Sequence, residues 1–197
     1  MAKIWSIGVF CGSASGVSPA YAANARKAGD AIARKGARLV YGGGDVGLMA
    51  ASAIAALDAG GPVLGVIPEF MISREGLLEK AETRIVTTMS SRKNILIAES
   101  DGFLILPGGV GTLEEIFDVL SRNRLGLQKK PVAFLNVDGF WDPLFKLMRK
   151  TEDEGFTPQG FSDGVLVESD PETAVRHLMD ALERGDGEFV SSEKVNF

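Results

Sequence analysis

Residues 103–115 decide the fold and read Phe103-Leu104-Ile105-Leu106-Pro107-Gly108-Gly109-Val110-Gly111-Thr112-Leu113-Glu114-Glu115. The apolar run from Phe103 to Leu106 ends at a proline and two glycines, and the segment from Leu113 to about Leu127 has helical periodicity. A short apolar run bounded by Gly and Pro predicts a buried strand. The stretch therefore predicts a strand, a Gly-rich turn over Pro107 to Thr112, and a helix.

The same alternation of short apolar runs and longer helical segments extends along the chain. Further strands are predicted over 4–10, 37–41, 62–67, 83–86, 131–136 and 164–168. Further helices are predicted over 19–35, 47–59, 89–100, 141–154 and 171–183, while 69–80 is predicted to be irregular and exposed. This alternation predicts an α/β fold with a parallel sheet that helices cover on both faces. We expect one domain over 1–183 and a flexible polar tail over 184–197.

Composition excludes several classes of protein. The chain has 197 residues, of which 45% are hydrophobic and 24% charged, and its net charge is −5, which argues against a dedicated nucleic-acid binder. Cys11 and His177 are the single residues of their types, so an intrachain disulfide and a zinc site built from Cys and His are excluded. No apolar stretch reaches the length of a membrane span. We expect a cytoplasmic protein with no metal site, membrane partner or nucleic-acid partner.

The start of the chain superficially resembles an export or lipid-attachment signal that ends at Cys11. The apolar run is short and contains Gly8, and the bulky Phe10 precedes the cysteine where such a signal needs a small residue. We therefore expect this segment to be the first strand of the sheet.

Three Gly-rich turns follow predicted strands. They are Cys11-Gly12-Ser13, Gly42-Gly43-Gly44 and Pro107 to Thr112. The carboxyl ends of parallel strands meet at one edge of the sheet, where ligands bind in open α/β folds. Glycine lets backbone N–H groups approach a ligand, and a helix start favours an anion. The candidate binding residues for a nucleotide-like anion at these turns are Gly12, Ser13, Gly43, Gly44, Gly108, Gly109, Gly111 and Thr112. Each turn by itself is also explained by a tight bend that needs positive φ.

Two familiar uses of such glycines do not fit. A P-loop needs a Gly-Lys pair, and the sequence has none. A dinucleotide fingerprint needs Gly-x-Gly-x-x-Gly after the first strand, whereas the chain has Gly12-Ser13-Ala14-Ser15-Gly16. P-loop ATP hydrolysis and NAD chemistry of the usual kind are therefore disfavoured.

Charged residues also stand at this edge. Arg92 and Lys93 lie in the first turns of the helix after the fourth strand, where the helix dipole disfavours cations. They form either a clamp for an anion or a base, or a solvated pair. Glu115 follows the Gly-rich turn, and its spacing from Thr112 also fits a capping box, in which Thr112 caps the helix and Glu115 reaches back to it.

The residues quoted above resemble the LONELY GUY (LOG) family of cytokinin riboside 5′-monophosphate phosphoribohydrolases, often labelled lysine decarboxylases. Pro107 to Glu115 matches the family motif PGGxGTxxE, and three further elements are similar: Phe10 to Ser13, Tyr41 to Met49, and Met89 to Lys93. The similarity extends from about Ile4 to Val137. It departs at Ser91 and Gln128, where many members have His, and this bears on base preference more than on the chemistry.

The resemblance implies a Rossmann-like, doubly wound parallel sheet and a homodimer without a cofactor. It implies hydrolysis of the N-glycosidic bond of adenosine 5′-monophosphate, plain or modified on its exocyclic amino group, to free base and ribose 5-phosphate. The family's catalytic residues fall on Arg92 and Glu115, and Met89 and Lys93 belong to the same binding element. Its phosphate-binding turn falls on Gly108, Gly109, Gly111 and Thr112.

The sequence leaves the roles and two alternatives open. We expect Glu115 to act on the ribose and water, and Arg92 on the leaving base or the phosphate. A nucleotide carrier that does not hydrolyse its ligand is the first alternative. A pyridoxal-phosphate lysine decarboxylase is weaker, because the chain is short and nothing marks an anchoring lysine. The helix beginning at Leu113 carries more apolar surface than one sheet face requires, which fits either a dimer interface or plain core packing within one chain.

Overall fold

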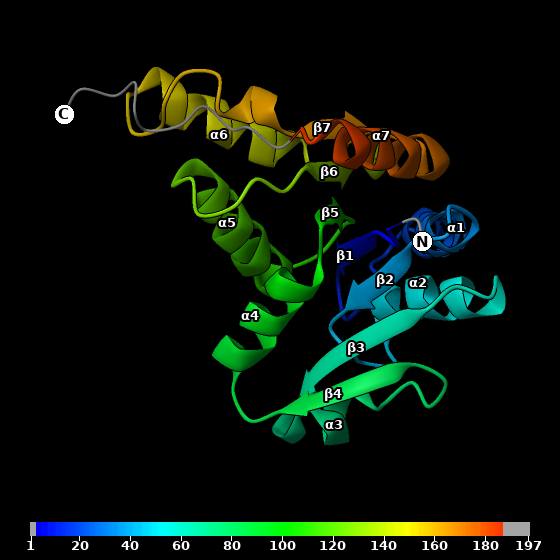
Figure 1. Cartoon of the computed structure of the whole chain (residues 1–197). Helices are drawn as coiled ribbons and strands as arrows, with labels where there is room; N and C mark the ends of the chain where they lie inside the picture. The colour runs from blue at the N-terminus through cyan, green and yellow to red at the C-terminus, as the bar shows by residue number, and fades with distance from the viewer. Residues whose placement is uncertain (1–2, 187–197) are drawn as a thin grey trace.

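The computed structural model describes residues 3–186, which form a parallel sheet of seven strands with helices on both faces (Figure 1). The strand order is β4-β3-β2-β1-β5-β6-β7, and each neighbouring pair is parallel. The strands are β1 Ser6–Phe10, β2 Arg38–Tyr41, β3 Val63–Pro68, β4 Glu82–Val86, β5 Gly102–Ile105, β6 Val132–Leu135 and β7 Leu166–Glu168. The order reverses between β1 and β5, which makes their carboxyl ends the expected place for a ligand.

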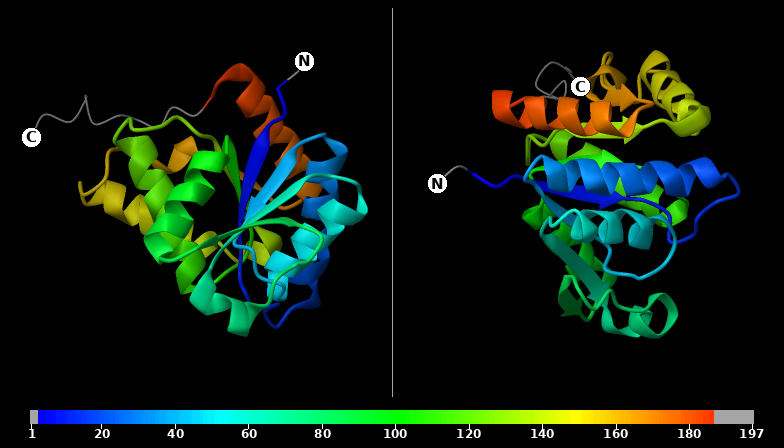
Figure 2. Two further views of the ribbon diagram at one scale, coloured as in Figure 1. Left: turned by 60° about the horizontal axis from the view of Figure 1, so that its bottom comes forward. Right: turned by 90° about the vertical axis from the view of Figure 1, so that its right-hand side faces the viewer.

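Two helical layers cover the sheet (Figures 1 and 2). One layer holds α1, α2 and α7, and the other holds α4, α5 and α6, while the short α3 lies beside β3 and β4. The helices are α1 Pro19–Arg34, α2 Gly47–Asp58, α3 Glu69–Glu75, α4 Met89–Glu99, α5 Val110–Arg124, α6 Asp142–Asp153 and α7 Pro171–Arg184, with short 3₁₀ turns η1 Val137–Gly139 and η2 Ser162–Gly164. The predicted single α/β domain of the Rossmann-like type is confirmed.

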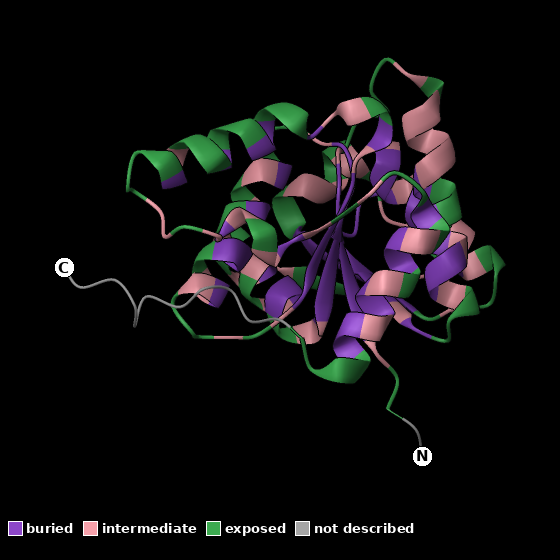
Figure 3. Cartoon of the chain, turned by 90° about the horizontal axis from the view of Figure 1, so that it is seen from above, coloured by how far each residue is buried: buried purple, intermediate pink, exposed green. Residues whose placement is uncertain are grey.

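The five inner strands of the sheet are buried because their side chains alternate between two apolar layers (Figure 3), whereas the edge strands β4 and β7 are partly exposed. Ile7 and Val9 of β1 face the layer of α1, α2 and α7. Phe10 faces the other layer, where its ring stacks on Phe103 of β5 with a centroid distance of 5.2 Å. The sheet centre is therefore dry on both faces, and the polar chemistry of the fold is left to the strand ends.

Two sequence-based boundaries differ from the structure. The segment 69–80, predicted to be irregular, begins with helix α3, which Pro68 precedes and Gly76 ends at a φ of 69°. Seven residues give too few turns for a periodic signal, so only the flanking Pro and Gly marked it. Helix α5 begins at Val110 rather than Leu113 and ends at Arg124. The Gly-rich segment thus supplies the first helical turn as well as the bend.

The carboxyl-terminal helix and its tail fall only partly within the structure. Helix α7 runs to Arg184, and Gly185 caps it with a φ of 73°. Arg184 also pairs with Asp186, at 2.6 Å. The predicted tail beyond residue 186 lies outside the described residues. No helix within residues 3–186 is long and apolar enough to cross a lipid bilayer.

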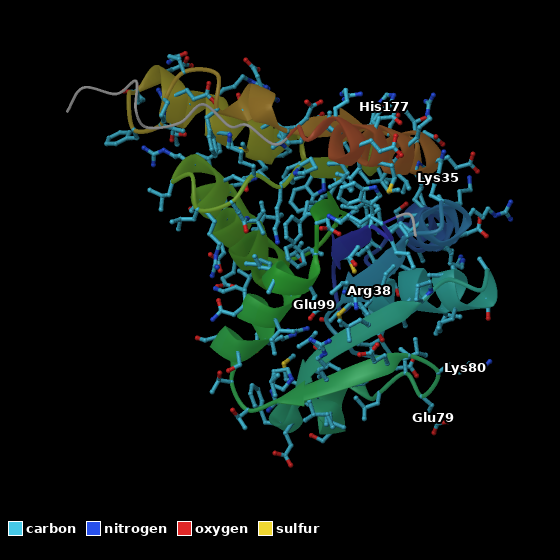
Figure 4. All side chains as sticks on the ribbon, viewed as in Figure 1. Lys35, Arg38, Glu79, Lys80, Glu99 and His177 are labelled. Carbon is cyan, nitrogen blue, oxygen red and sulfur yellow. The ribbon has the colours of Figure 1, made fainter. Side chains whose placement is uncertain are left out.

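Ion pairs join neighbouring elements at the amino-end edge of the sheet (Figure 4). Glu99, the last residue of α4, accepts from Arg38 of β2 at 2.6 Å and from Arg84 of β4 at 2.5 Å. These contacts join two strands and a helix at the edge opposite the Gly-rich turns. The sole histidine, His177 on α7, pairs with Glu168 of β7 at 2.7 Å. All three pairs belong to the scaffold and lie apart from the Gly-rich turns, which carry the candidate site.

Candidate functional site

A cavity of about 260 Å³ lies at the carboxyl edge, beside the point where the strand order reverses. Its walls come from the turns after β1, β2 and β5 and from helices α2, α3, α4 and α5. Most of the site residues predicted from the sequence line it, namely Gly12, Ser13, Met89, Arg92, Gly109, Gly111, Thr112 and Glu115. The fold thus brings together residues that are up to 103 positions apart in the chain, since Gly12 and Glu115 face one cavity.

Arg92 is buried at the cavity wall, with 7% of its surface exposed. Its Nε donates to the Val66 carbonyl oxygen at 3.1 Å and its Nη2 to the Gly42 carbonyl oxygen at 2.9 Å. The structure gives it no ion pair with a carboxylate among residues 3–186. A guanidinium stays charged at any physiological pH, and burying an ion without a counter-ion costs several kcal/mol. The site therefore holds a positive charge that is free to act on a ligand.

The position of Arg92 depends on Gly42. A Cβ at residue 42 would lie 2.1 Å from the Arg92 Nη2 atom and 2.9 Å from the Met49 sulfur. Any larger residue would therefore push the guanidinium away from the carbonyl that holds it. This explains the glycine after β2 as a space requirement of the arginine.

Glu115 projects from the second turn of α5 into the same cavity and has no hydrogen bond to another described residue. Burial raises the pKa of its carboxyl to about 7, and the neighbouring carboxylates Glu114 and Glu75 add to this, while the Arg92 charge opposes it. A carboxyl with a pKa near 7 exchanges its proton at physiological pH, which suits acid–base or electrostatic work.

The capping box considered for Glu115 is wrong. Gly109 stands at the N-cap position of α5, and Thr112 is buried inside the first helical turn, so it does not cap the helix. Glu115 consequently cannot reach back to a capping threonine in the way the spacing suggested. No capping role accounts for its place in the cavity.

The start of α5 is built to face an anion. Its N-cap residue, Gly109, has no side chain to satisfy the first N–H groups, and no acidic residue lies in the first turn. The N–H groups of Val110, Gly111 and Thr112 precede the first intrahelical bond, which runs from Leu113 N–H to the Gly109 carbonyl oxygen at 3.0 Å. Such free donors and the helix dipole favour a phosphate at this point.

Four predicted binding residues lie elsewhere. Gly43 packs against Val66 and Ile67, and Gly44 lies against Glu75 and Met49, behind the cavity wall. Gly108 lines a neighbouring cavity, and a Cβ there would lie 2.2 Å from the Thr112 hydroxyl oxygen.

Lys93 is the fourth predicted binding residue that does not line this cavity. Its ammonium group pairs with Glu114 and, at 3.3 Å, with Asp118, both on α5, and these contacts raise the pKa of Lys93. In this structure Lys93 joins α4 to α5 and does not line the cavity.

Glu75 and Met71 of α3 also line the cavity. They were not among the predicted site residues, because the segment 69–80 was predicted to be irregular. Glu75 Oε2 is buried and has no hydrogen-bond partner within residues 3–186. The Met71 sulfur lies 4.0 Å from Arg92 Nη1. A helix N-terminal proline at 68 and a glycine at 76 were the available signals.

Cys11 also lines the cavity and is 8% exposed. Burial raises the pKa of its thiol, and the Glu115 charge raises it further. A protonated thiol is a poor nucleophile. Arg92 and Glu115 are consequently the groups in the cavity best suited to chemistry.

The environment of Glu115 predicts a stability change. Because its folded-state pKa of about 7 lies above the ordinary glutamate pKa of 4.5, ionising Glu115 destabilises the fold as the pH rises through 7. Glu115→Gln should raise the free energy of unfolding at pH 8 by about 1–3 kcal/mol, measured by urea denaturation. The gain should shrink as the pH falls toward 4.5.

Glu114→Gln is the matched control, since Glu114 is exposed and faces Lys93. It should show no such pH-dependent gain. If the gain in unfolding free energy of Glu115→Gln is absent at pH 8, or grows as the pH falls, the result would contradict a half-buried and readily protonated Glu115.

Comparison with known proteins gives consistent results. A family model described as possible lysine decarboxylase matches residues 49–178. A cytokinin riboside 5′-monophosphate phosphoribohydrolase of Arabidopsis thaliana is 44% identical over 149 residues, which cover 75% of this chain and 69% of that protein. The protein with this same enzyme name from Rhodococcoides fascians is 42% identical over 175 residues, covering 86% of this chain and 87% of its own length.

Among solved structures, the molybdenum cofactor carrier protein of Chlamydomonas reinhardtii has a TM-score of 0.72. The two chains are 24% identical, and the match covers 92% of this chain and 99% of that one. This likeness concerns the fold alone. The sequence identities and the family model show that the chain belongs to the LONELY GUY family, as do these two cytokinin riboside 5′-monophosphate phosphoribohydrolases.

Proposed function

We propose that the protein hydrolyses the N-glycosidic bond of adenosine 5′-monophosphates, plain or modified on the exocyclic amino group, to free base and ribose 5-phosphate. One observation carries this proposal: Arg92 and Glu115 line the same cavity at the start of α5. Arg92 is buried without a counter-ion, and the carboxyl pKa of Glu115 is about 7. The activity named for the relatives supports the same reaction.

The geometry favours one orientation of the substrate. The N–H groups at the start of α5 are the natural partners of the 5′-phosphate. Arg92 is held by carbonyl groups of residues in or just after β2 and β3, on the other side of the cavity, among Met49, Met71 and Met89. These apolar thioethers suit the faces of a purine. The phosphate is therefore assigned to α5 and the base to the Arg92 side.

The chemistry follows from this orientation. As the bond from the ribose carbon to the base nitrogen breaks, the sugar gains positive charge and the base takes the electron pair. A Glu115 carboxylate stabilises the sugar and accepts a proton from the attacking water. The water oxygen bonds to the sugar carbon, and the proton that Glu115 accepts from the water passes to the leaving base nitrogen, which returns Glu115 to its carboxylate form. Arg92 offsets the negative charge of the leaving base but retains its own proton.

Glu75 completes the polar side of the cavity. Its buried, unpaired Oε2 is a hydrogen-bond acceptor, whereas Arg92 and the α5 N–H groups are donors. The hydroxyl and amino groups of a nucleotide need such an acceptor. Glu75 is therefore assigned to binding, and Glu115 to the reacting centre.

Loss of either charged group should abolish turnover. We expect Glu115→Gln and Arg92→Met each to lower kcat for base release at least about 100-fold, because both act in the transition state. Base release is measured by chromatography with AMP and with isopentenyladenosine 5′-monophosphate, and the ratio of the two rates ranks the substrates.

Glu114→Gln serves as the control, since its exposed carboxylate neighbours Glu115 in sequence but pairs with Lys93. It should keep near-normal turnover. A folded Glu115→Gln protein with normal turnover would remove Glu115 from the mechanism. Binding of AMP without release of base from either nucleotide would favour the carrier alternative.

The rate should depend on pH through Glu115. Since its carboxylate form is the active one, kcat/KM for AMP should fall as the pH drops below about 7, where Glu115 becomes protonated. Assays between pH 5 and pH 9 would locate the inflection. A rate that rises toward pH 5 would instead assign the protonated acid to the reaction.

The decarboxylase label of the family model finds no support in the cavity. Among the described residues that line it there is no lysine, the residue that would have to bind a pyridoxal aldehyde. Absorbance of the protein mixed with pyridoxal phosphate tests this point separately.

We further propose that the protein forms a homodimer through α5 and α6. This face exposes Phe117, Leu125, Leu127, Leu147 and Phe156, of which Phe156 is 80% exposed. An apolar hollow of about 230 Å³ lies between the two helices beside Phe117 and Leu147. Exposed apolar side chains gathered on neighbouring elements are typical of a subunit interface.

Disrupting this face should give a monomer. Leu125→Asp places a charge on the apolar face and should halve the mass measured by size-exclusion chromatography with light scattering. Ile54→Asp is the matched control, because Ile54 is a 40% exposed apolar residue on α2, in the other helical layer. A Leu125→Asp protein that remains dimeric would place the interface elsewhere.

A further inference from the structure

A second cavity, of about 300 Å³, adjoins the candidate site and has no place in the proposed reaction. It lies between the turn after β1, the start of the turn after β5, and the chain following η1. Its lining includes Gly12, Ser13, Gly109, Tyr21 and Phe140.

The two cavities meet at the phosphate turn. Gly12, Ser13 and Gly109 line both of them. The turns after β1 and β5 are joined there, because the Gly12 N–H donates to the Pro107 carbonyl oxygen at 3.0 Å. A ligand with its phosphate at the start of α5 therefore has one cavity on each side. A nucleoside monophosphate with its base on the Arg92 side, as proposed above, leaves the second cavity empty.

The chemistry of the second cavity differs from that of the first. Tyr21 and Phe140 form an aromatic wall, with ring centroids 5.7 Å apart and an angle of 76° between the rings. Both side chains are half-buried. None of the described residues that line this cavity is charged. The wall therefore suits a neutral, planar ring, since aromatic side chains stack on heterocyclic bases.

We propose that the second cavity binds the distal base of a dinucleotide whose two nucleosides are joined by a 5′,5′-pyrophosphate. The proximal nucleoside lies in the first cavity, the pyrophosphate at Gly12, Ser13 and Gly109, and the distal base against Tyr21 and Phe140. The proposal rests on the proposed function for the position of the first phosphate. Such a dinucleotide competes with the monophosphate substrate for the protein.

The test compares two ligands that differ by one base. Diadenosine pyrophosphate carries the distal adenine, whereas ADP-ribose has the same pyrophosphate and both riboses but lacks it. Calorimetry with the full chain should give a Kd about tenfold lower for the dinucleotide, the effect of one stacked base. Equal Kd values for the two ligands, or no binding of the dinucleotide, would overturn the proposal.

Variants of the aromatic wall locate the effect. Tyr21→Leu and Phe140→Leu should each remove most of the tenfold difference in Kd between the two ligands and leave the Kd of ADP-ribose unchanged. Tyr21→Phe keeps the aromatic ring and should keep the difference in Kd. Thermal unfolding checks that each variant is folded. If neither Leu variant narrows the difference, the distal base lies elsewhere.

The outcomes separate this proposal from the function it rests on. Competition is measured as inhibition of base release from AMP, and direct binding is measured by calorimetry without turnover. Binding of AMP and ADP-ribose with no further gain from the second base rejects the distal subsite alone. Failure of all three ligands to bind rejects the nucleotide site itself and, with it, the proposed function.

Discussion

The site depends on a buried guanidinium that is held by backbone carbonyls and has no counter-ion. Arg92 is fixed by carbonyl oxygens of Val66 and Gly42, and a side chain on residue 42 would displace it. Two neutral carbonyls orient the cation without cancelling its charge. Folding therefore holds in place an arginine whose unbalanced charge favours an electron-rich ligand.

Glu115 lines the same cavity as Arg92 but does not form an ion pair with it. Glu115 is brought close enough for Arg92 to oppose its rise in pKa, yet burial dominates and holds the pKa near neutrality. A direct ion pair would have lowered that pKa and left both groups less responsive to a substrate. The start of α5 adds donors for a phosphate, so a cation, a weakly acidic carboxyl and an anion cradle surround a small volume.

Much of this arrangement was predictable, because strand–helix alternation fixed the sheet and the Gly-rich turns marked its active edge. The errors came from segments where one local signal competed with another. Glycines at 108, 109 and 111 suggested a turn, but Gly109 is the N-cap and the helix already includes Gly111, so the capping box was misplaced. Glu75 was missed because α3 is too short for a periodic signal. The predicted substrate contact of Lys93 stays a prediction, since in this structure its ammonium group pairs with Glu114 and Asp118 on α5.

A crystal structure of the Glu115→Gln protein with AMP tests the central claim most directly. The account predicts the phosphate at the N–H groups of Gly111 and Thr112, the adenine against Met89 on the Arg92 side, and the amide of residue 115 beside the ribose. A phosphate bound to Arg92 with the base turned toward α5 would contradict it, because the cation would then serve as an anion anchor and not offset charge on the leaving base.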